Sequence, residues 1–235
     1  MNTAIKDRVI RLSIFIAWFL FILVLFSTGK LAIFIRKSYA PLSLAAAIVI
    51  AGLIVNNLKE KHEASHASLT WRFLALFLFP LALALLARPD TLSTFAVARR
   101  GITSEVTISN TELLNMMKSH VEQEGRYRTM TLKQALAFSK EEPVQANGMS
   151  ISTEGLVLKN KDTGTDTFIL IRFLIFCCAA DATPLGIPVT WDKSVELKQD
   201  TWVRVNGKLV VEQNGAKIVG EEVTVVPQPS DPYLY

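Results

Sequence analysis

Two adjacent cysteines, Cys177 and Cys178, and the nearby Asp181 are the residues whose types and spacing suggest the most unusual chemistry. The chain has no other cysteine, which excludes a disulfide framework of the kind found in small secreted domains. Neighbouring side chains on a strand point to opposite faces, so the two thiols converge only if the strand ends here. We interpret Asp181 and Pro184 as signs of such an end, because Asp favours turns and Pro cannot donate to a central sheet ladder.

Three functional interpretations of this segment stay open. With Asp181 as a third ligand, the thiolates would bind a borderline metal such as zinc. In the second interpretation the two cysteines form a strained vicinal disulfide that acts as a redox switch. In the third, one of them is a free reactive thiol. The structural alternative is a buried cysteine pair in an apolar strand, because Cys is among the most buried residue types.

Enzymatic catalysis has little support in the sequence. The C-terminal half holds no histidine beyond His120, which disfavours a Cys-His nucleophile or a serine triad. Thiol oxidoreductases separate their two cysteines by two residues, whereas adjacent cysteines close a strained ring that is easily reduced. We therefore expect a protein that is not an enzyme.

His62 and His66 form a second candidate for metal binding, in a polar loop that also carries Glu63. Residues four apart share one face of a helix, and imidazole nitrogens suit a borderline metal. Because tight zinc sites usually have three or four ligands, the alternative is a solvated polar loop without a metal.

The N-terminal part of the chain is strongly apolar. Hydrophobic residues make up 50% of the chain, and nearly all of the excess lies before Arg88. A helix of about 20 apolar residues crosses a bilayer, and charges are absent from Leu12 to Gly29 and from Ser38 to Leu58. We expect membrane spans over residues 10–29, 38–58 and 69–87, within a helical region of residues 1–89.

The third predicted span is shorter than the other two. Its uncharged part, Phe73 to Ala87, contains Pro80 and reaches across a bilayer only if Arg72 extends its side chain to the interface. The alternative is a re-entrant or interfacial helix.

The basic residues that flank the spans predict the topology. Three spans place one group on one side (Lys6, Arg8, Arg11, Lys59, Lys61 and Arg72) and a smaller group on the other (Lys30, Arg36, Lys37 and Arg88). The positive-inside rule then leaves the C-terminal domain outside the cytoplasm, in a multi-pass protein of the cell membrane. The net charge of +4 is modest and no basic cluster is interleaved with aromatics, so we expect no nucleic-acid partner.

A β-rich aqueous domain over residues 144–235 is expected after a linker with short helices over residues 90–143. Capping boxes at Ser109–Glu112 and Thr131–Gln134 predict two helix starts. An apolar period of two then predicts strands around residues 149–158, 168–176, 187–191, 202–211 and 218–226. Five short strands without a long helix between them indicate an α+β domain with a small OB-like barrel, and a sandwich fragment is the alternative.

Several motifs resemble those of one bacterial family. They are Gly29-Lys30-Leu31, Arg172-Phe173, Cys177-Cys178-Ala179-Ala180-Asp181-Ala182, Trp202-Val203-Arg204-Val205-Asn206-Gly207 and the tail Pro232-Tyr233-Leu234-Tyr235. With them the chain resembles the YcgQ-like family, whose members are described as permease subunits. The resemblance implies a small membrane protein that works beside a larger multi-span permease, with a link to zinc handling. Family members often carry a His-rich loop between spans, which is reduced here to His62 and His66.

Two functional hypotheses follow. The first is an accessory subunit of a permease or transport complex, seated in the lipid bilayer and presenting a metal, with zinc as the candidate, at Cys177, Cys178 and Asp181. The second is a membrane-anchored ligand-binding or sensing module built on the OB-like domain. In the second, Trp191 and Trp202 would offer a stacking surface, although core packing is the commoner use of such residues.

Overall fold

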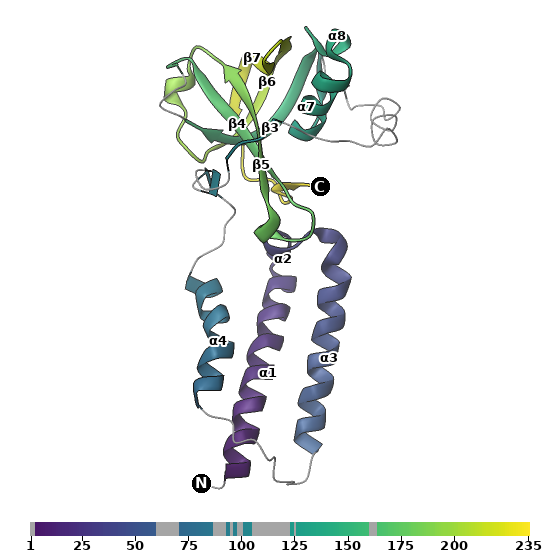
Figure 1. Ribbon diagram of the computed structural model, residues 1–235, viewed down its shortest axis with the longest axis vertical. Helices are drawn as coiled ribbons and strands as arrows, with labels where there is room; N and C mark the ends of the chain where they lie inside the picture. The colour runs from purple at the N-terminus through teal and green to yellow at the C-terminus, as the bar shows by residue number, and fades with distance from the viewer. Residues whose placement is uncertain are drawn as a thin grey trace. The chain divides into compact units, whose positions relative to one another are not determined.

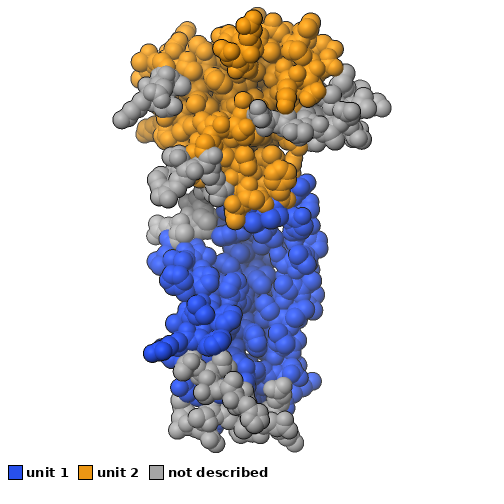
Figure 2. Space-filling view, in the orientation of Figure 1, with its two compact units in different colours: residues 1–91, 177–179 blue, residues 92–176, 180–235 orange. Residues whose placement is uncertain are grey.

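The computed structural model describes residues 3–59, 71–86, 93–94, 96–97, 101–104, 123–124, 126–159 and 164–235. It divides into two compact units, one of Met1–Thr91 with Cys177–Ala179 and one of Leu92–Phe176 with Ala180–Tyr235 (Figure 2). The helix start predicted at Ser109–Glu112 lies outside the described residues.

Two long apolar helices form most of the first unit, α1 (Thr3–Ser27) and α3 (Ala40–Lys59) (Figure 1). The stretches Ile5–Ser27 and Lys37–Lys59 are both long and apolar enough to cross a membrane. Only 6% of the most apolar window of each is buried, so apolar side chains cover the outside of both helices, as expected for a surface that faces lipid. The two predicted N-terminal apolar helices are confirmed. The short helix α2 (Leu31–Phe34) and the 3₁₀ turn η1 (Lys37–Tyr39) connect them.

A third apolar helix, α4 (Trp71–Leu86), is shorter and contains Pro80. At 1.5 Å per residue its length is about 24 Å, less than the ~30 Å of a bilayer's hydrocarbon core. The Trp18 indole N–H of α1 donates to the Phe77 carbonyl of α4 over 3.3 Å. The described residues therefore contain a helix within the third predicted span, and its passage through a membrane stays a prediction.

Five long strands of the second unit form a closed barrel (Figure 1). They are β3 (Ser150–Leu158), β4 (Thr167–Leu174), β5 (Thr183–Thr190), β6 (Trp202–Glu212) and β7 (Gly215–Val225). The sheet runs β3-β6-β7-β5-β4, and β4 pairs again with β3, which closes it. The β5–β7 pair is parallel, and the other barrel pairs are antiparallel. The predicted five-stranded OB-like barrel is confirmed, and the sandwich alternative is excluded.

Shorter elements complete the second unit. The strands β1 (Gln123–Glu124), β2 (Tyr127–Thr129) and β8 (Tyr233–Leu234) extend the sheet, and the helix α8 (Pro143–Ala146) follows α7 (Leu132–Glu141). Strands of two or three residues are too short to show an alternating pattern, so the sequence did not predict them.

The helix α7 begins at the capping box predicted from the sequence. The Thr131 hydroxyl accepts from the Gln134 amide over 3.2 Å, and the Gln134 side chain accepts from the Thr131 amide over 2.8 Å. One face of α7, with Leu132, Ala135 and Leu136, packs into the same core as the inward residues of the barrel strands. Because the cap stabilises the first turn, the helix start is held at the edge of β2 and β3.

A β-bulge in the β6–β7 pair depends on Gly207. Asn206 pairs with Glu222 and Gly207 pairs with Gly220, which leaves Glu221 as an extra residue on β7. A Cβ atom at Gly207 would lie 2.3 Å from the Val219 carbonyl oxygen and 2.9 Å from the Gly220 Cα. Only glycine fits here, because both obstacles are backbone atoms.

The bulge also turns the extra residue toward the short strand β2. The Tyr127 hydroxyl donates to a Glu221 carboxylate oxygen over 2.7 Å, and Arg126 forms an ion pair with the same carboxylate. The hydrogen bond from Tyr127 lowers the pKa of Glu221, and the charge of Arg126 acts in the same direction.

We predict that Gly207→Ala lowers the free energy of unfolding of the barrel by about 2–3 kcal/mol. This is the upper part of the usual cost of overpacking, because the new Cβ would meet backbone atoms that cannot move aside. Gly220→Ala is the matched control on the facing strand, because its Cβ would meet neighbours at 3.4 Å, an ordinary contact. Denaturant unfolding of the detergent-solubilised chain, followed by near-UV circular dichroism, measures both. Equal stability of the two variants would contradict the close backbone contact at Gly207.

Candidate functional site

The strand β4 ends before the two cysteines, as the sequence analysis anticipated. Its last residue is Leu174, and a 3₁₀ turn, η2 (Ala179–Asp181), follows. The Asp181 carboxylate accepts from the Phe176 amide over 2.9 Å, which closes the loop between strand and turn. Because the chain is no longer extended, neighbouring side chains no longer have to point to opposite faces.

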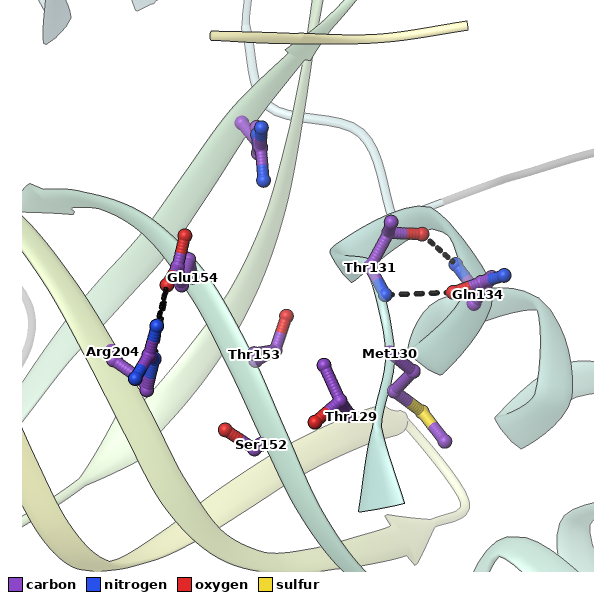
Figure 3. A pocket seen from close by; sticks show the side chains of 9 residues that line it. Thr129, Met130, Thr131, Gln134, Ser152, Thr153, Glu154 and Arg204 are labelled. Carbon is purple, nitrogen blue, oxygen red and sulfur yellow. Dashed lines mark hydrogen bonds and ion pairs between the residues drawn. The ribbon is translucent and has the colours of Figure 1, made fainter. Parts of the chain in front are cut away.

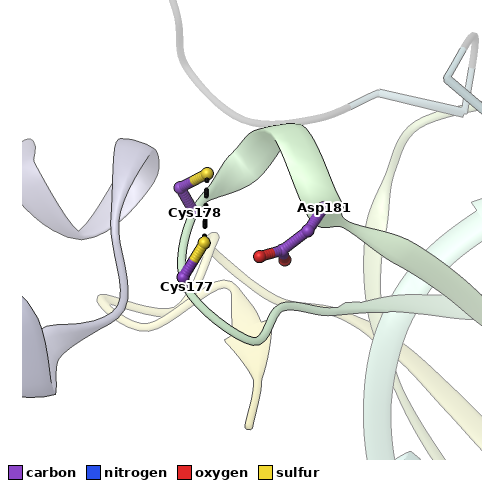
Figure 4. Close-up of side chains that lie close together, drawn as sticks. All are labelled: Cys177, Cys178 and Asp181. Atoms are coloured by element: carbon purple, nitrogen blue, oxygen red, sulfur yellow. Dashed lines mark hydrogen bonds between the residues drawn. The ribbon is translucent and has the colours of Figure 1, made fainter.

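The loop brings the three predicted metal ligands together (Figure 4). One ligand atom each from Cys177, Cys178 and Asp181 lies within 4.8 Å of the other two. The two sulfurs are 3.5 Å apart and are not joined in a disulfide. Cys177 is exposed and Cys178 is half-buried, so the alternative of a buried cysteine pair in a strand is wrong.

Three converging donors of this kind suit a borderline divalent cation. Thiolate sulfur is a soft ligand that favours Zn²⁺ and Cu⁺ over Mg²⁺ and Ca²⁺, and a carboxylate completes many zinc sites. Three protein ligands leave one position of a tetrahedral zinc ion open to water, substrate or another protein. The chemistry that the loop supports is therefore reversible binding of a metal rather than its permanent enclosure.

The other residues singled out from the sequence fall into two groups. His62 and His66 lie outside the described residues. Trp202 is 7% exposed and packs in a core with Phe173 and Tyr233, and Trp191 packs against the main barrel core. Both tryptophans are thus used in packing, and neither forms an open stacking surface.

A cleft of about 270 Å³ lies at the edge of the barrel (Figure 3). Strands β2, β3, β4 and β6 and the start of α7 contribute to it. Its lining residues are mostly polar: Thr129, Met130, Thr131, Gln134, Ser152, Thr153, Glu154, Arg172 and Arg204. All of them belong to the second unit.

Two arginines and one glutamate determine the charge of this cleft. Nε and Nη2 of Arg204 donate to the same oxygen of Glu154, over 2.9 and 2.7 Å. The Arg172 guanidinium lies over the Trp202 ring, 5.5 Å from its centroid, and donates to the backbone carbonyls of Asp231 and Pro232. Burial lowers the pKa of Arg172, and the charge of Glu154 opposes this effect. Since arginine remains ionised in proteins, the lining residues include one more cation than anion, and Asp231 and Tyr235 lie near Arg172 outside the lining.

This cleft was not predicted from the sequence. Its one available signal was the cation Arg172 within the apolar run Thr167–Leu174, because a charge in a buried strand needs a partner. Glu154 and Arg204 look like ordinary outward positions of alternating strands. Their proximity follows only from the register that places them opposite one another in β3 and β6.

The convergence of the two sulfurs can be tested without a metal. We predict that the full-length protein in detergent retains a trivalent arsenical, which forms bonds to two thiolates, because its sulfurs lie 3.5 Å apart. Cys177→Ser and Cys178→Ser should each abolish retention against a monothiol wash, as measured by mass spectrometry of the intact protein. Full retention by either single variant would show that the two thiols do not act together.

Two apolar helices of membrane-crossing length, joined to an OB-like barrel with a Cys-Cys-Asp loop, define the class of protein. Residues 10–103 match the family model described as the DUF1980 N-terminal domain, and residues 133–235 match the DUF1980 C-terminal domain. The chain belongs to the DUF1980 family of YcgQ-like proteins, which confirms the resemblance drawn from its motifs.

Similarity to individual proteins is more distant. The chain is 26% identical over 99 residues to the UPF0703 protein YcgQ of Bacillus subtilis (strain 168), and the match covers 40% of this chain and 35% of that protein. The solved structure of the hypothetical protein ygiW from E. coli matches over 44% of this chain and 100% of its own length, with 14% identity and a TM-score of 0.30. The OBody AM1L10, solved bound to hen egg-white lysozyme, matches over 36% of this chain and 85% of its own length, with 16% identity and a TM-score of 0.26.

Proposed function

We propose that this protein is a membrane-embedded accessory subunit of a transport complex and that its Cys177–Cys178–Asp181 loop binds the zinc ion that the complex handles. The observation that carries the proposal is the convergence of three ligand atoms within 4.8 Å, in a chain with two helices of membrane-crossing length. In this role the metal is cargo, and the protein presents it without chemical conversion.

The chemistry of the loop supports presentation rather than storage. Cys177 is exposed, so a partner can reach the metal from solvent. A ligand set of two thiolates and one carboxylate leaves a coordination position that a donor from a partner can fill, and ligand exchange then passes the ion on. The partner proposed here is a multi-span permease, because two helices of membrane-crossing length among the described residues are too few to enclose a transport path by themselves.

The proposed setting is the cell membrane, with α1, α3 and α4 seated in the lipid bilayer. The exposed apolar surface of α1 and α3 supports this setting. The distribution of basic residues around the spans supports a location of the barrel domain outside the cytoplasm, where it would meet the metal before the permease does.

We predict that the purified full-length protein, kept reduced in detergent, binds about one Zn²⁺ per chain, as expected when thiolates and a carboxylate converge on one ion. Cys177→Ser, Cys178→Ser and Asp181→Asn should each weaken zinc binding at least about tenfold, because loss of a group that only hydrogen-bonds to a ligand already costs that much, and these residues are proposed as direct ligands. Elemental analysis gives the stoichiometry, and competition with a chromophoric chelator gives the affinity.

Asp192→Asn is the matched control, since Asp192 is an exposed carboxylate of the same domain outside the cluster. It should bind zinc as the unmodified chain does. Asp181→Asn keeps an oxygen that can accept from the Phe176 amide, so the loop closure survives while the anionic ligand is lost. Zinc binding that is equal in all four variants and the parent chain would exclude the loop as a metal site.

We also predict that a multi-span membrane protein co-purifies with the tagged chain from native membranes under mild detergent. Helices whose apolar sides are exposed in the isolated chain provide the surface for that association. Quantitative mass spectrometry against a tag-only preparation identifies the partner. Recovery of the chain without any multi-span partner would contradict the role of a subunit.

A further inference from the structure

We propose that the cleft between β2, β3, β4, β6 and the start of α7 is a binding site for a small oxyanion, a carboxylate or phosphate group carried by a small molecule. This site is separate from the proposed metal loop: the residues that line it include none of Cys177, Cys178 and Asp181. The inference goes beyond the proposed function, and either can fail without the other.

The first argument is the hydroxyl of Thr153. This residue is 2% exposed, and within the described part of the chain its Oγ1 has no hydrogen-bond partner. Figure 3 shows the hydroxyl directed into the space between Glu154 and Thr131. A buried hydroxyl without a partner is unfavourable, so a group that accepts its hydrogen bond stabilises the site when it binds.

The position of Thr153 in the barrel strengthens this argument. It stands opposite Val205 in the β3–β6 pair, and the next inward residues of β3 on either side, Ile151 and Gly155, are apolar and buried. An apolar residue would therefore satisfy packing at this position. A threonine here breaks the alternating pattern, which is expected where binding rather than stability decides the residue.

The second argument is the excess of positive charge. Among the lining residues Arg172 and Arg204 face one carboxylate, that of Glu154, while the charges of Asp231 and Tyr235 act on Arg172 from outside the lining. The hydrogen bonds described for each guanidinium use Nε and Nη2, so the Nη1 groups remain available as donors. A planar guanidinium recognises the paired oxygens of a carboxylate or phosphate more strongly than it does a neutral group.

The size of the cleft limits the ligand to a small molecule. Its volume of about 270 Å³ is just below the range of sites for drug-sized ligands, about 300–1,000 Å³. The neutral donors and acceptors of Thr129, Gln134 and Ser152 complete a lining suited to hydroxyl groups beside the oxyanion. A hydroxy acid or a small phosphorylated compound meets these requirements.

The test is isothermal titration of the full-length protein in detergent with four probes: acetate, malate, citrate and inorganic phosphate, with glycerol as the uncharged reference. We expect saturable binding of at least one anion and none of glycerol. Preference for malate or citrate would identify a carboxylate as the ligand group, and preference for inorganic phosphate would identify a phosphate.

Two variants connect binding to the cleft. Thr153→Val keeps the shape and removes the hydroxyl, and Arg204→Gln removes one cation; each should weaken binding about tenfold or more, as loss of a hydrogen bond to a charged group does. Lys217→Gln is the matched control for charge, because Lys217 pairs with Glu212 at the β6–β7 hairpin, away from the lining residues. It should leave binding unchanged.

The thermal midpoint of each variant separates binding from folding. Thr153→Val should keep or raise the midpoint, since it removes an unpartnered buried hydroxyl, so this variant decides the matter if Arg204→Gln fails to fold. The proposal is overturned if no probe binds saturably. It is equally overturned if Thr153→Val binds the preferred probe as tightly as the parent chain.

Discussion

The short pairing between β3 and β4 is the contact on which the architecture of the second unit depends. It joins Leu156–Leu158 to Ile169–Ile171 and converts an open sheet into a closed barrel. Gly155 permits it, because a Cβ there would lie 2.7 Å from the Ile171 carbonyl oxygen and 2.9 Å from the Leu170 side chain. The pairing stops at this glycine, so beyond it the two strands separate. The space left between them is part of the polar cleft, and the end of β4, which pairs there with β5 and β8, runs on to the cysteine loop.

The sequence predicted those features that depend on near neighbours. The alternation of buried residues in β6, the apolar runs of α1 and α3 and the capping box at Thr131 each require only a few adjacent residues, and all are present. The convergence of Cys177 and Cys178 depended on where β4 ends, and Asp181 marked that end. The sequence therefore offered convergence as one interpretation, beside a buried cysteine pair in a strand.

The cleft depended instead on register, which no local pattern specifies. Glu154 lies opposite Arg204 only because of the β3–β6 pairing, and residues of β2 reach β3 by a parallel pairing that the sequence did not suggest. Thr153 was hidden for the same reason, since a threonine in a strand is ordinary until its neighbours are known. The pairing of strands that are distant in the chain therefore could not be predicted from this one sequence.

The strand β8 and the residues just before it contact the end of β4 and the Arg172 side chain. Tyr233 and Leu234 pair with Phe173 and Leu174, and the Leu234 carbonyl accepts from the Ile175 amide just before the cysteine loop. The preceding carbonyls of Asp231 and Pro232 hold the Arg172 guanidinium. One short segment thus makes hydrogen bonds both to Arg172, a residue of the cleft, and to Ile175, just before the cysteine loop. A ligand that drew Arg172 away from these carbonyls would remove two of the contacts that hold this segment against β4. The same short stretch of chain therefore anchors a charged side chain and the strand end from which the cysteine loop departs.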